Sequence, residues 1–316
     1  MNHRVGLIVP TLNAGARWQD WLNRANQQSL IPARKLAIDS SSSDGTPTLA
    51  RAAGFEVVSI ARSDFNHGGT RQKAVDLLDD CDIVVFLTQD ALLASADALS
   101  RLVAAFDEPD VAVAYGRQLP HEDAAPIGAH ARLFNYPANG LKKTLADVPR
   151  LGIKTAFCSN SFAAYRRSDL LAIGGFAANV IFGEDAHAST RLLLTRKAVC
   201  YVAEAQVYHS HDYTFAEDFR RYFDIGVFHA RERWMIDALG PAEGEGFRFI
   251  RSEATYLLKN APWLLPSALA RAALKYTAYQ LGRRERMLSP NRKRKLSLNR
   301  AFWSNVPPQG SNIENC

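Results

Sequence analysis

Short apolar runs alternate with segments of helical pattern along the first 90 residues of the chain. The runs occupy residues 5–9, 36–38, 55–60 and 83–87. Between the first two, Trp18, Trp21 and Leu22 lie at the i, i+3 and i+4 spacing of one helix face. Strands that alternate with helices predict an α/β fold, here a Rossmann-like, mostly parallel sheet with right-handed crossovers.

The fourth run, residues 83–87, consists of five consecutive apolar residues and is followed by a single carboxylate, Asp90. Such a run predicts a strand buried on both faces in the centre of the sheet. Ligands of open α/β sheets bind outside the carboxyl edge of the strands, where Asp90 is placed to hold a metal or a substrate hydroxyl. The alternative is structural: Asp90 ends the strand or caps a helix expected from Ser95.

Polar residues also follow the first two strands at the same expected edge. Pro10 is expected to stop the first strand, and the next turn, PTLNAG, lacks the GxGxxG pattern of dinucleotide-binding folds. Asp39 ends the second strand, where an acidic group can accept hydrogen bonds from a ribose or a base. Its alternative role is an Asx turn that caps the serine-rich loop. In that loop Asp44, Gly45 and Thr46 predict a turn.

A glycine-bearing loop, residues 66–71, leads into the helix before the fourth strand. Its backbone amides and the guanidinium of Arg71 suit a diphosphate. A lone arginine at the start of a helix is more often part of a surface ion pair, so both interpretations stay open.

The regular alternation is lost in the second half of the chain. Residues 117–156 contain several prolines and predict a mobile loop region where a second substrate enters. A strand over residues 162–165 and a helix from about Arg167 should follow. Gly174 and Gly175 are suited to a left-handed cap at the end of that helix.

Two groups of ionisable residues come next. Glu184 and Asp185 precede a helix expected over residues 186–194, where the helix dipole stabilises acidic residues by about 0.3–1 kcal/mol. The functional interpretation makes Asp185 a general base at the cleft. His209 and His211 lie at i and i+2 on an extended segment, point the same way and form a candidate pair of metal ligands, although a single histidine is more often a core residue.

The 316-residue chain has a globular composition and a formal net charge of +6. Residues 283–300 hold eight Lys or Arg against one acid, so the rest of the chain is close to neutral. The cysteines, Cys81, Cys158, Cys200 and Cys316, show no CxxC spacing, which argues against a zinc site or a disulfide framework and fits a reducing compartment. Without a signal peptide or an apolar run of ~18 residues, a cytoplasmic location is expected.

The order of these motifs over about residues 4–235 resembles family 2 glycosyltransferases, which have the type A nucleotide-sugar fold. The matching stretches are PTLN at 10–13, Asp39 with DGT at 44–46, TQDA at 88–91, GGF at 174–176, Glu184 with Asp185, and His209. A narrower resemblance is to bacterial rhamnosyltransferases of polysaccharide assembly. It is carried by FNHGGTR at 65–71, LTQDA at 87–91, YHSHDYT at 208–214 and RYFD at 221–224.

The resemblance implies a donor, dTDP-β-L-rhamnose, and a set of residues that bind it. This set is Pro10, Thr11, Asn13, Asp39, Asp44, Arg71, Gln89 and Asp90. Asp90 matches the last carboxylate of the DxD motif that binds Mg²⁺ or Mn²⁺, but Thr88 replaces the first one. We therefore expect His209 or His211 to supply a further ligand.

The resemblance also implies an inverting transfer with Glu184 and Asp185 as the catalytic residues. Asp185 would deprotonate the acceptor hydroxyl as that hydroxyl attacks the anomeric carbon, and general-base help of this kind is worth roughly 10²- to 10⁴-fold.

Residues 239–316 lie beyond the resemblance and predict a helical, basic C-terminal extension after a catalytic domain of residues 1–238. The basic clusters, with Phe302 and Trp303 just beyond them, favour peripheral contact with the inner face of the cytoplasmic membrane. By analogy the acceptor would be a saccharide linked to a lipid there. The alternative is a solvated terminus. No motif that reads nucleic acid is present, so no nucleic-acid partner is expected.

Three functions therefore stay open from the sequence. The leading one is rhamnosyl transfer in O-antigen or other surface polysaccharide synthesis. The second is transfer of another sugar from a dTDP- or UDP-hexose, and the third is a non-catalytic nucleotide-sugar-binding or scaffold protein. Thr88 favours the third, whereas Glu184, Asp185 and the two histidines favour catalysis.

Overall fold

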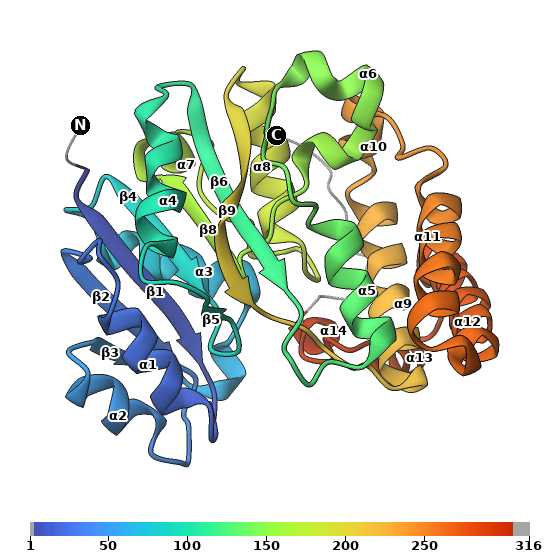
Figure 1. Cartoon of the computed structure of the whole chain (residues 1–316), viewed down its shortest axis with the longest axis horizontal. Coiled ribbons are helices and arrows are strands. Elements are labelled where there is room, and N and C mark those ends of the chain that lie inside the picture. The colour runs from blue at the N-terminus through green and yellow to red at the C-terminus, as the bar shows by residue number, and fades with distance from the viewer. Residues whose placement is uncertain (1–2, 306–316) are drawn as a thin grey trace, which may run out of the picture.

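The computed structural model describes residues 3–305, which form a nine-stranded sheet with helices on both faces (Figure 1). Cys316 lies outside the described residues. The strands are β1 (Val5–Thr11), β2 (Arg34–Asp39), β3 (Glu56–Ser59), β4 (Ile83–Leu87), β5 (Leu92–Leu93), β6 (Val111–Leu119), β7 (Leu141–Lys143), β8 (Phe162–Arg166) and β9 (Ala198–Tyr208). The α-helices are α1 (Trp18–Asn26), α2 (Thr46–Ala52), α3 (His67–Leu77), α4 (Ala98–Ala104), α5 (Pro126–Asn135), α6 (Val148–Leu151), α7 (Arg167–Ala172), α8 (Glu184–Leu194), α9 (Phe215–Arg231), α10 (Arg233–Leu239), α11 (Glu245–Asn260), α12 (Leu265–Arg283), α13 (Pro290–Leu296) and α14 (Phe302–Asn305).

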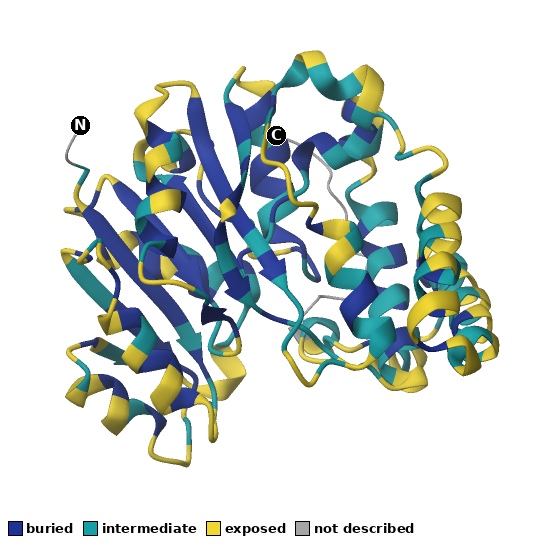
Figure 2. Ribbon diagram, in the orientation of Figure 1, coloured by how far each residue is buried: buried dark blue, intermediate teal, exposed yellow. Residues whose placement is uncertain are grey.

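The first half of the sheet is parallel, as the alternating pattern predicts. Strands β3, β2, β1 and β4 are neighbours in that order, and every residue of β4 is buried. Successive residues of β1 point to opposite faces: Leu7 packs with α1, α2 and α4 on one face, and Ile8 packs with α3, α7 and α8 on the other. Burial is therefore continuous along the central strand β4 and nearly so along β1, whereas the edge strand β3 and the outer faces of the helices are partly exposed (Figure 2).

Pro10 does not stop β1, contrary to the expectation from sequence, because the strand continues to Thr11. The pairing of β1 with β4 ends at Ile8, and beyond it β1 pairs only with β2. A proline is tolerated where one side of a strand lacks a ladder partner. The expected left-handed cap after α7 is confirmed, since Gly174 and Gly175 have φ angles of 80° and 72°.

The second half of the sheet is mixed and brings distant loops together. Strand β8 is antiparallel to both β4 and β6, and β9 runs parallel to β6. The short strand β5 pairs with the end of β9, with Leu92 opposite Tyr208. Asp90, just before β5, therefore lies beside the residues that follow β9. It does not cap a helix, because α4 begins only at Ala98.

The loop region expected over residues 117–156 is largely ordered secondary structure. Strand β6 extends to Leu119, and α5, β7 and α6 follow it. The prolines that suggested loops, Pro126 and Pro149, lie in the first turns of α5 and α6. Proline is favoured there because its missing N–H has no partner within the helix.

The C-terminal helices pack against the preceding part of the chain through a close helix crossing. A Cβ atom added to Gly282 of α12 would lie 2.0 Å from the carbonyl oxygen of Phe223 in α9, and one added to Gly226 would lie 2.2 Å from that of Tyr279. Only glycine allows this approach. The predicted boundary at residues 238/239 between the catalytic domain and the C-terminal extension falls at the end of α10, and the division into these two parts stays a prediction.

Phe302 and Trp303 pack against the C-terminal core cluster instead of forming the free aromatic tip that the sequence suggested. The Arg231 guanidinium lies 5.3 and 5.1 Å from the centres of their rings, and the Lys293 ammonium lies 5.2 Å from that of Trp303. Among residues 3–305, no helix is long and apolar enough to cross a bilayer.

Candidate active site

Asp90, His209 and His211 converge at the carboxyl edge of the sheet. Asp90 Oδ2 lies 3.4 Å from His209 Nε2 and 3.6 Å from His211 Nε2, and the two Nε2 atoms lie 3.0 Å apart. One ligand atom from each residue falls within 4.8 Å of the others, so together they could hold a metal ion. The structure thus places both histidines next to Asp90, and their role as metal ligands stays a prediction.

Gln118, at the end of β6, orients His209. Its Oε1 accepts hydrogen bonds from Arg132 at 2.6 Å and faces His209 Nδ1 at 2.8 Å, and its Nε2 donates to Ser159 Oγ at 2.9 Å. Since Arg132 can only donate, Oε1 must be the acceptor, and His209 Nδ1 must carry its proton. In the neutral form of His209 the lone pair of Nε2 then faces Asp90, which is the arrangement of a metal-binding histidine with a hydrogen-bonded partner behind it, whereas protonated His209 donates from Nε2 to Asp90.

The ionisation states of this cluster also suit a cation. Desolvation raises the pKa of Asp90, but the hydrogen bond and charge of His209 outweigh it and hold the pKa of Asp90 well below its usual range. Burial, with a further contribution from His209, lowers the pKa of His211 to about 4. Near neutral pH the cluster thus offers a carboxylate and a neutral imidazole, the forms that bind metals.

Glu184 and Asp185 open α8, and the loop before β8 holds both of them. Asn160 donates from its backbone N–H to Asp185 Oδ2 at 3.1 Å and from its side-chain Nδ2 to Glu184 Oε1 at 3.0 Å. Arg71 of α3 forms an ion pair of 3.0 Å with Glu184, and both side chains are less than a tenth exposed. Glu184 is therefore neutralised by an arginine, whereas Asp185 has no such partner among the residues described.

This difference separates the pKa values of the two neighbouring carboxyls. Burial raises the pKa of Glu184, but Arg71, His67 and Asn160 lower it to a net value below the usual range. Burial also raises the pKa of Asp185, and the charge of Glu184 raises it further, to about 7, against the backbone hydrogen bonds from Asn160 and Ala186. A carboxylate with a raised pKa is a stronger base than an ordinary aspartate.

Hydrogen bonds through one loop connect the cluster of Asp90, His209 and His211, here called the metal-type cluster, to the carboxylate pair Glu184 and Asp185. The loop of residues 159–161 accepts the hydrogen bond from Gln118 at Ser159, and Asn160 of the same loop holds Glu184 and Asp185. The backbone N–H of Thr88, two residues before Asp90, donates to Ser161 O at 3.1 Å. The two groups thus face the same edge of the sheet, as the sequence predicted.

The loops after β1 and β2 form a second connected unit at this edge. Thr11 Oγ1 donates to Asp39 Oδ1 at 2.9 Å, and the Ser42 backbone N–H donates to Asp39 Oδ2 at 2.9 Å. Asn13, with φ of 46°, accepts the Ser43 backbone N–H at 2.8 Å. Asp39 therefore caps the serine-rich loop, the structural alternative raised from sequence. Nucleotide contacts of Thr11, Asn13 and Asp39 stay predictions.

Other residues of the predicted donor set have structural partners. Gln89 accepts from the Leu12 backbone N–H at 2.8 Å and donates to its carbonyl oxygen at 3.1 Å, which ties the β1 loop to the Asp90 segment. Asp44 accepts from the Thr46 backbone N–H at 3.0 Å and forms the expected turn. Arg71 is buried against Glu184, so the structure gives it a partner other than the expected diphosphate. Donor contacts of Pro10, Asp44, Gln89 and Arg71 stay predictions.

Sequence reasoning did not assign functional roles to Gln118, Arg132 and Asn160. A glutamine beyond an apolar strand and an arginine in a proline-rich stretch carry no pattern of their own. Asn160 lies in a polar run, residues 159–161, directly before an apolar strand, whereas Asp90 was singled out because it follows one. The polar run could have directed attention to Asn160, but not to its two carboxylate partners.

Residues 7–174 match the protein family described as Glycosyl transferase family 2, which covers more than half of the sequence. The chain belongs to glycosyltransferase family 2. It is 45% identical over 304 residues to the O-antigen chain rhamnosyltransferase RfbN of Salmonella typhimurium, covering 96% of this chain and 97% of that one. It is also 46% identical over 301 residues to the O-antigen chain rhamnosyltransferase WbaN of Salmonella anatum, covering 95% and 96% of the two chains.

Solved structures confirm the fold of this family 2 glycosyltransferase. The mannosyltransferase PcManGT from Pyrobaculum calidifontis, in complex with GDP-Man and Mn²⁺, superposes with a TM-score of 0.57 at 20% identity, covering 96% of this chain and 86% of that one. Residues 1–349 of S. aureus TarS, in complex with UDP, give a TM-score of 0.53 at 14% identity, with 90% and 91% covered. The α/β fold predicted from sequence, with a helical C-terminal region, is confirmed.

Proposed function

We propose that this glycosyltransferase moves L-rhamnose from dTDP-β-L-rhamnose to a saccharide acceptor in the synthesis of O-antigen or another surface polysaccharide. The names of the two Salmonella relatives, which match nearly the whole chain, support the choice of sugar and product. One structural observation carries the chemistry: Gln118 and the loop of residues 159–161 join a metal-type cluster to a carboxyl whose pKa is raised toward neutrality.

We infer that a divalent cation binds to Asp90, His209 and His211. The donor set fits, since one carboxylate and two imidazoles face each other and Gln118 fixes the free lone pair of His209. Imidazoles disfavour Mg²⁺, which prefers oxygen ligands, so Mn²⁺ is the better match of the two expected ions. When bound, such an ion stabilises the negative charge that develops on the leaving diphosphate.

Asp185 acts as the general base of an inverting displacement. The acceptor hydroxyl gives its proton to a carboxylate oxygen of Asp185 as the hydroxyl oxygen bonds to the anomeric carbon, and the bond from that carbon to the nucleotide diphosphate breaks. Glu184 does not exchange protons in this scheme. Its charge, held by Arg71, raises the basicity of Asp185, and Asn160 holds both carboxylates in place.

We further propose that the nucleotide lies against the joined loops after β1 and β2, where Thr11, Asn13 and Asp39 are held. The acceptor is a saccharide linked to a lipid, and the protein contacts an anionic membrane surface at the inner face of the cytoplasmic membrane. Exposed cations of the C-terminal helices support this contact.

The test is to incubate the protein with a panel of nucleotide sugars and a saccharide acceptor, with and without Mn²⁺ or Mg²⁺, and to measure the release of nucleotide diphosphate. We expect metal-dependent release from dTDP-β-L-rhamnose above all other donors. Preferred release from another dTDP- or UDP-hexose would replace the proposed sugar. If the protein binds the donor and releases nothing with any acceptor, it is a binding protein and the proposed catalysis is wrong.

A further inference from the structure

A groove runs along the contact between α5 and α11, on a part of the molecule distant in sequence from the donor loops. It has a volume of about 520 Å³, and its walls include Phe134 of α5 and Tyr256 of α11. The same helix α5 carries Arg132, which donates to Gln118 and so supports the metal-type cluster. The single helix α5 thus lies between the groove and the candidate active site: Phe134 lines the groove, and Arg132 supports the metal-type cluster.

Two of the three cationic residues that line the groove have no acidic partner in the described part of the chain. Arg251 and Lys259 line it, are exposed and have no ion-pair partner among residues 3–305, while Arg248 pairs with Glu245. The other acid of α11, Glu253, is buried. The exposed face of α11 that carries Arg251 and Lys259 therefore attracts anions.

A buried polar atom in the wall of the groove also lacks a partner. His130 lines the groove and is 2% exposed; its Nε2 faces Ser252 Oγ at 2.9 Å, whereas its Nδ1 has no hydrogen-bond partner among the described residues. Burial lowers the pKa of His130, so the positive charge of the groove comes from the arginines and the lysine. An unpaired polar atom in a buried position is uncommon and costly, but Nδ1 is not accessible to solvent, so binding of an anion in the groove depends on Arg251 and Lys259.

Large apolar side chains are exposed on α11, next in sequence to the groove residues Arg248 and Lys259. Phe247 and Leu258 of α11 are 72% and 61% exposed, and they share one helix face with Ile250 and Ala254. Trp263, between α11 and α12, is 73% exposed. Exposed aromatic and aliphatic residues beside cationic ones are typical of a helix that lies in the interface of a bilayer.

We propose that the α5–α11 groove and the apolar residues beside it dock the enzyme on an anionic lipid bilayer, with a lipid phosphate held in the groove. This proposal rests on the proposed function, because it places the enzyme where a lipid-linked acceptor is found. It assigns the membrane contact to α11 and its neighbours and not to the basic tail of residues 283–300. In that tail Lys293 is already paired with Glu285, and the two aromatic residues are packed against the core.

Charge decides between a bilayer and a second copy of the chain as the occupant. A symmetric dimer through this face would set Arg251 and Lys259 of one copy against the same residues of the other, without an exposed acid between residues 246 and 284 to compensate. Like charges opposed in this way disfavour association. An anionic bilayer supplies both the complementary charge and an apolar layer for Phe247, Leu258 and Trp263.

The experiment measures binding of the full chain to vesicles of phosphatidylcholine alone and of phosphatidylcholine with 30% phosphatidylglycerol, by co-sedimentation. We expect binding only to the anionic vesicles. The double variant Arg251→Glu/Lys259→Glu should weaken binding to the anionic vesicles at least about tenfold, since each Lys or Arg near an anionic surface contributes substantially to the binding free energy. The matched control, Arg292→Glu/Arg294→Glu, reverses two exposed charges of the tail and should weaken binding less than threefold. The opposite ranking would overturn the proposal.

Two further arms identify the occupant. Trp263→Ser should also weaken vesicle binding several-fold, and a Trp263 fluorescence emission that shifts to the blue with vesicles supports its insertion. Binding of inorganic phosphate without binding to anionic vesicles, or a dimer in solution that Arg251→Glu/Lys259→Glu disrupts, would overturn the proposal. Metal-dependent release of nucleotide diphosphate, measured without vesicles, should be equal in all these variants. Its absence from the unmodified protein would count against the proposed function alone.

Discussion

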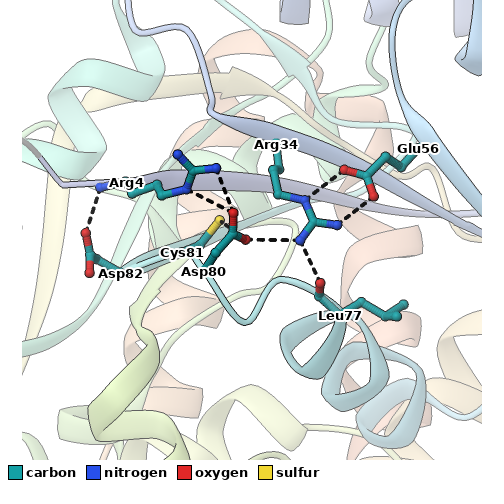
Figure 3. Close-up of polar contacts among 7 residues, drawn as sticks. All are labelled: Arg4, Arg34, Glu56, Leu77, Asp80, Cys81 and Asp82. Carbon is teal, nitrogen blue, oxygen red and sulfur yellow. Dashed lines mark hydrogen bonds and ion pairs between the residues drawn. The ribbon is translucent and has the colours of Figure 1, made fainter.

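Acidic and basic side chains lie at both edges of the sheet, but the ion pairs that they form differ between the two edges. At the amino edge, Arg4 and Arg34 contact Asp80 at 2.7 and 3.0 Å, and Arg34 also contacts Glu56 at 2.6 Å (Figure 3). The hydrogen bonds from Arg34 and Arg4 lower the pKa of Asp80 to about 2. Each carboxylate there has an arginine partner, and the network lies partly in solvent.

At the carboxyl edge only one of two neighbouring carboxylates has an arginine partner among the described residues. Arg71 pairs with Glu184, both of them buried, and Asp185 is left beside the charge of Glu184 with a raised pKa. The comparison shows that charge alone does not mark a functional site. A carboxylate with its own arginine is fixed in its ionised form, whereas one held beside a like charge is available for proton transfer.

The largest expected effect comes from removing the unpaired carboxylate. Asp185→Asn should lower the rate of sugar transfer by roughly 10²- to 10⁴-fold, because the acceptor hydroxyl loses its base. Donor binding, measured by calorimetry, should change little. Asp80→Asn removes a paired carboxylate at the opposite edge and should leave the transfer rate unchanged.

The stability of the Asp185→Asn variant provides a check on folding. The pKa of Asp185 is raised in the folded state to about 7, so its contribution to stability is present below the ordinary aspartate pKa and is lost as the pH rises through 7. The variant should therefore melt at a higher temperature than the parent at pH 8. A lower melting temperature, or near-normal transfer, would contradict the assignment of the base.

Glu184→Gln tests the charge that tunes the base. The variant leaves the buried Arg71 without its counter-charge, which should destabilise the fold by about 3–5 kcal/mol in urea unfolding. The pKa of Asp185 should fall, so the rise of the transfer rate with pH should move from near 7 to lower pH. Glu56→Gln breaks an exposed pair with Arg34 and should cost less than about 1 kcal/mol without moving the pH profile. An unchanged pH profile in Glu184→Gln would show that Glu184 does not tune Asp185.

Gln118→Ala tests the residue behind the metal-type cluster. Without the Gln118 oxygen, His209 Nδ1 loses its acceptor, and the affinity for Mn²⁺ should fall roughly 10- to 100-fold. The transfer rate should recover at saturating Mn²⁺, which a titration of activity against metal concentration measures. Gln206→Ala, on β9, whose side chain donates to the Ala203 carbonyl oxygen at 3.2 Å, is the control. Equal metal affinities in the two variants would exclude the orienting role.

The smallest effect is expected at the amino edge. Arg34→Met removes both of its ion pairs, yet partly exposed pairs contribute only about 0–1 kcal/mol each. Urea unfolding should show a loss of at most about 2 kcal/mol, and the transfer rate should not change. A loss of activity here would show that the two edges are coupled and that their comparison does not separate structure from function.

Much of the fold and part of the site follow from local patterns in the sequence. The apolar run 83–87, the alternation of strands and helices and the glycine cap after α7 each depend on residues close together in the chain, and the structure has all three. The i, i+2 spacing of His209 and His211 likewise predicts that the two rings share one side of an extended segment, and their Nε2 atoms meet.

Other features depended on which segments pack together. The prolines of residues 117–156 suggested a loop, but Pro126 lies in the first turn of α5. Phe302 and Trp303 pack against Arg231, which is distant in the chain. In both cases the residue types are compatible with either outcome, because a proline starts a helix as readily as it ends one and an aromatic residue can be buried or exposed.

The sequence by itself therefore determined the chemical groups at the carboxyl edge, and the tertiary structure decided how they are paired. The antiparallel pairing of β5 with β9 places Asp90 next to the two histidines. The packing of α3 near the start of α8 places Arg71 in an ion pair with Glu184 and not with Asp185. Strand register and helix packing join residues far apart in the chain, which local periodicity does not specify. The pKa difference between two adjacent carboxyls arises from that packing alone.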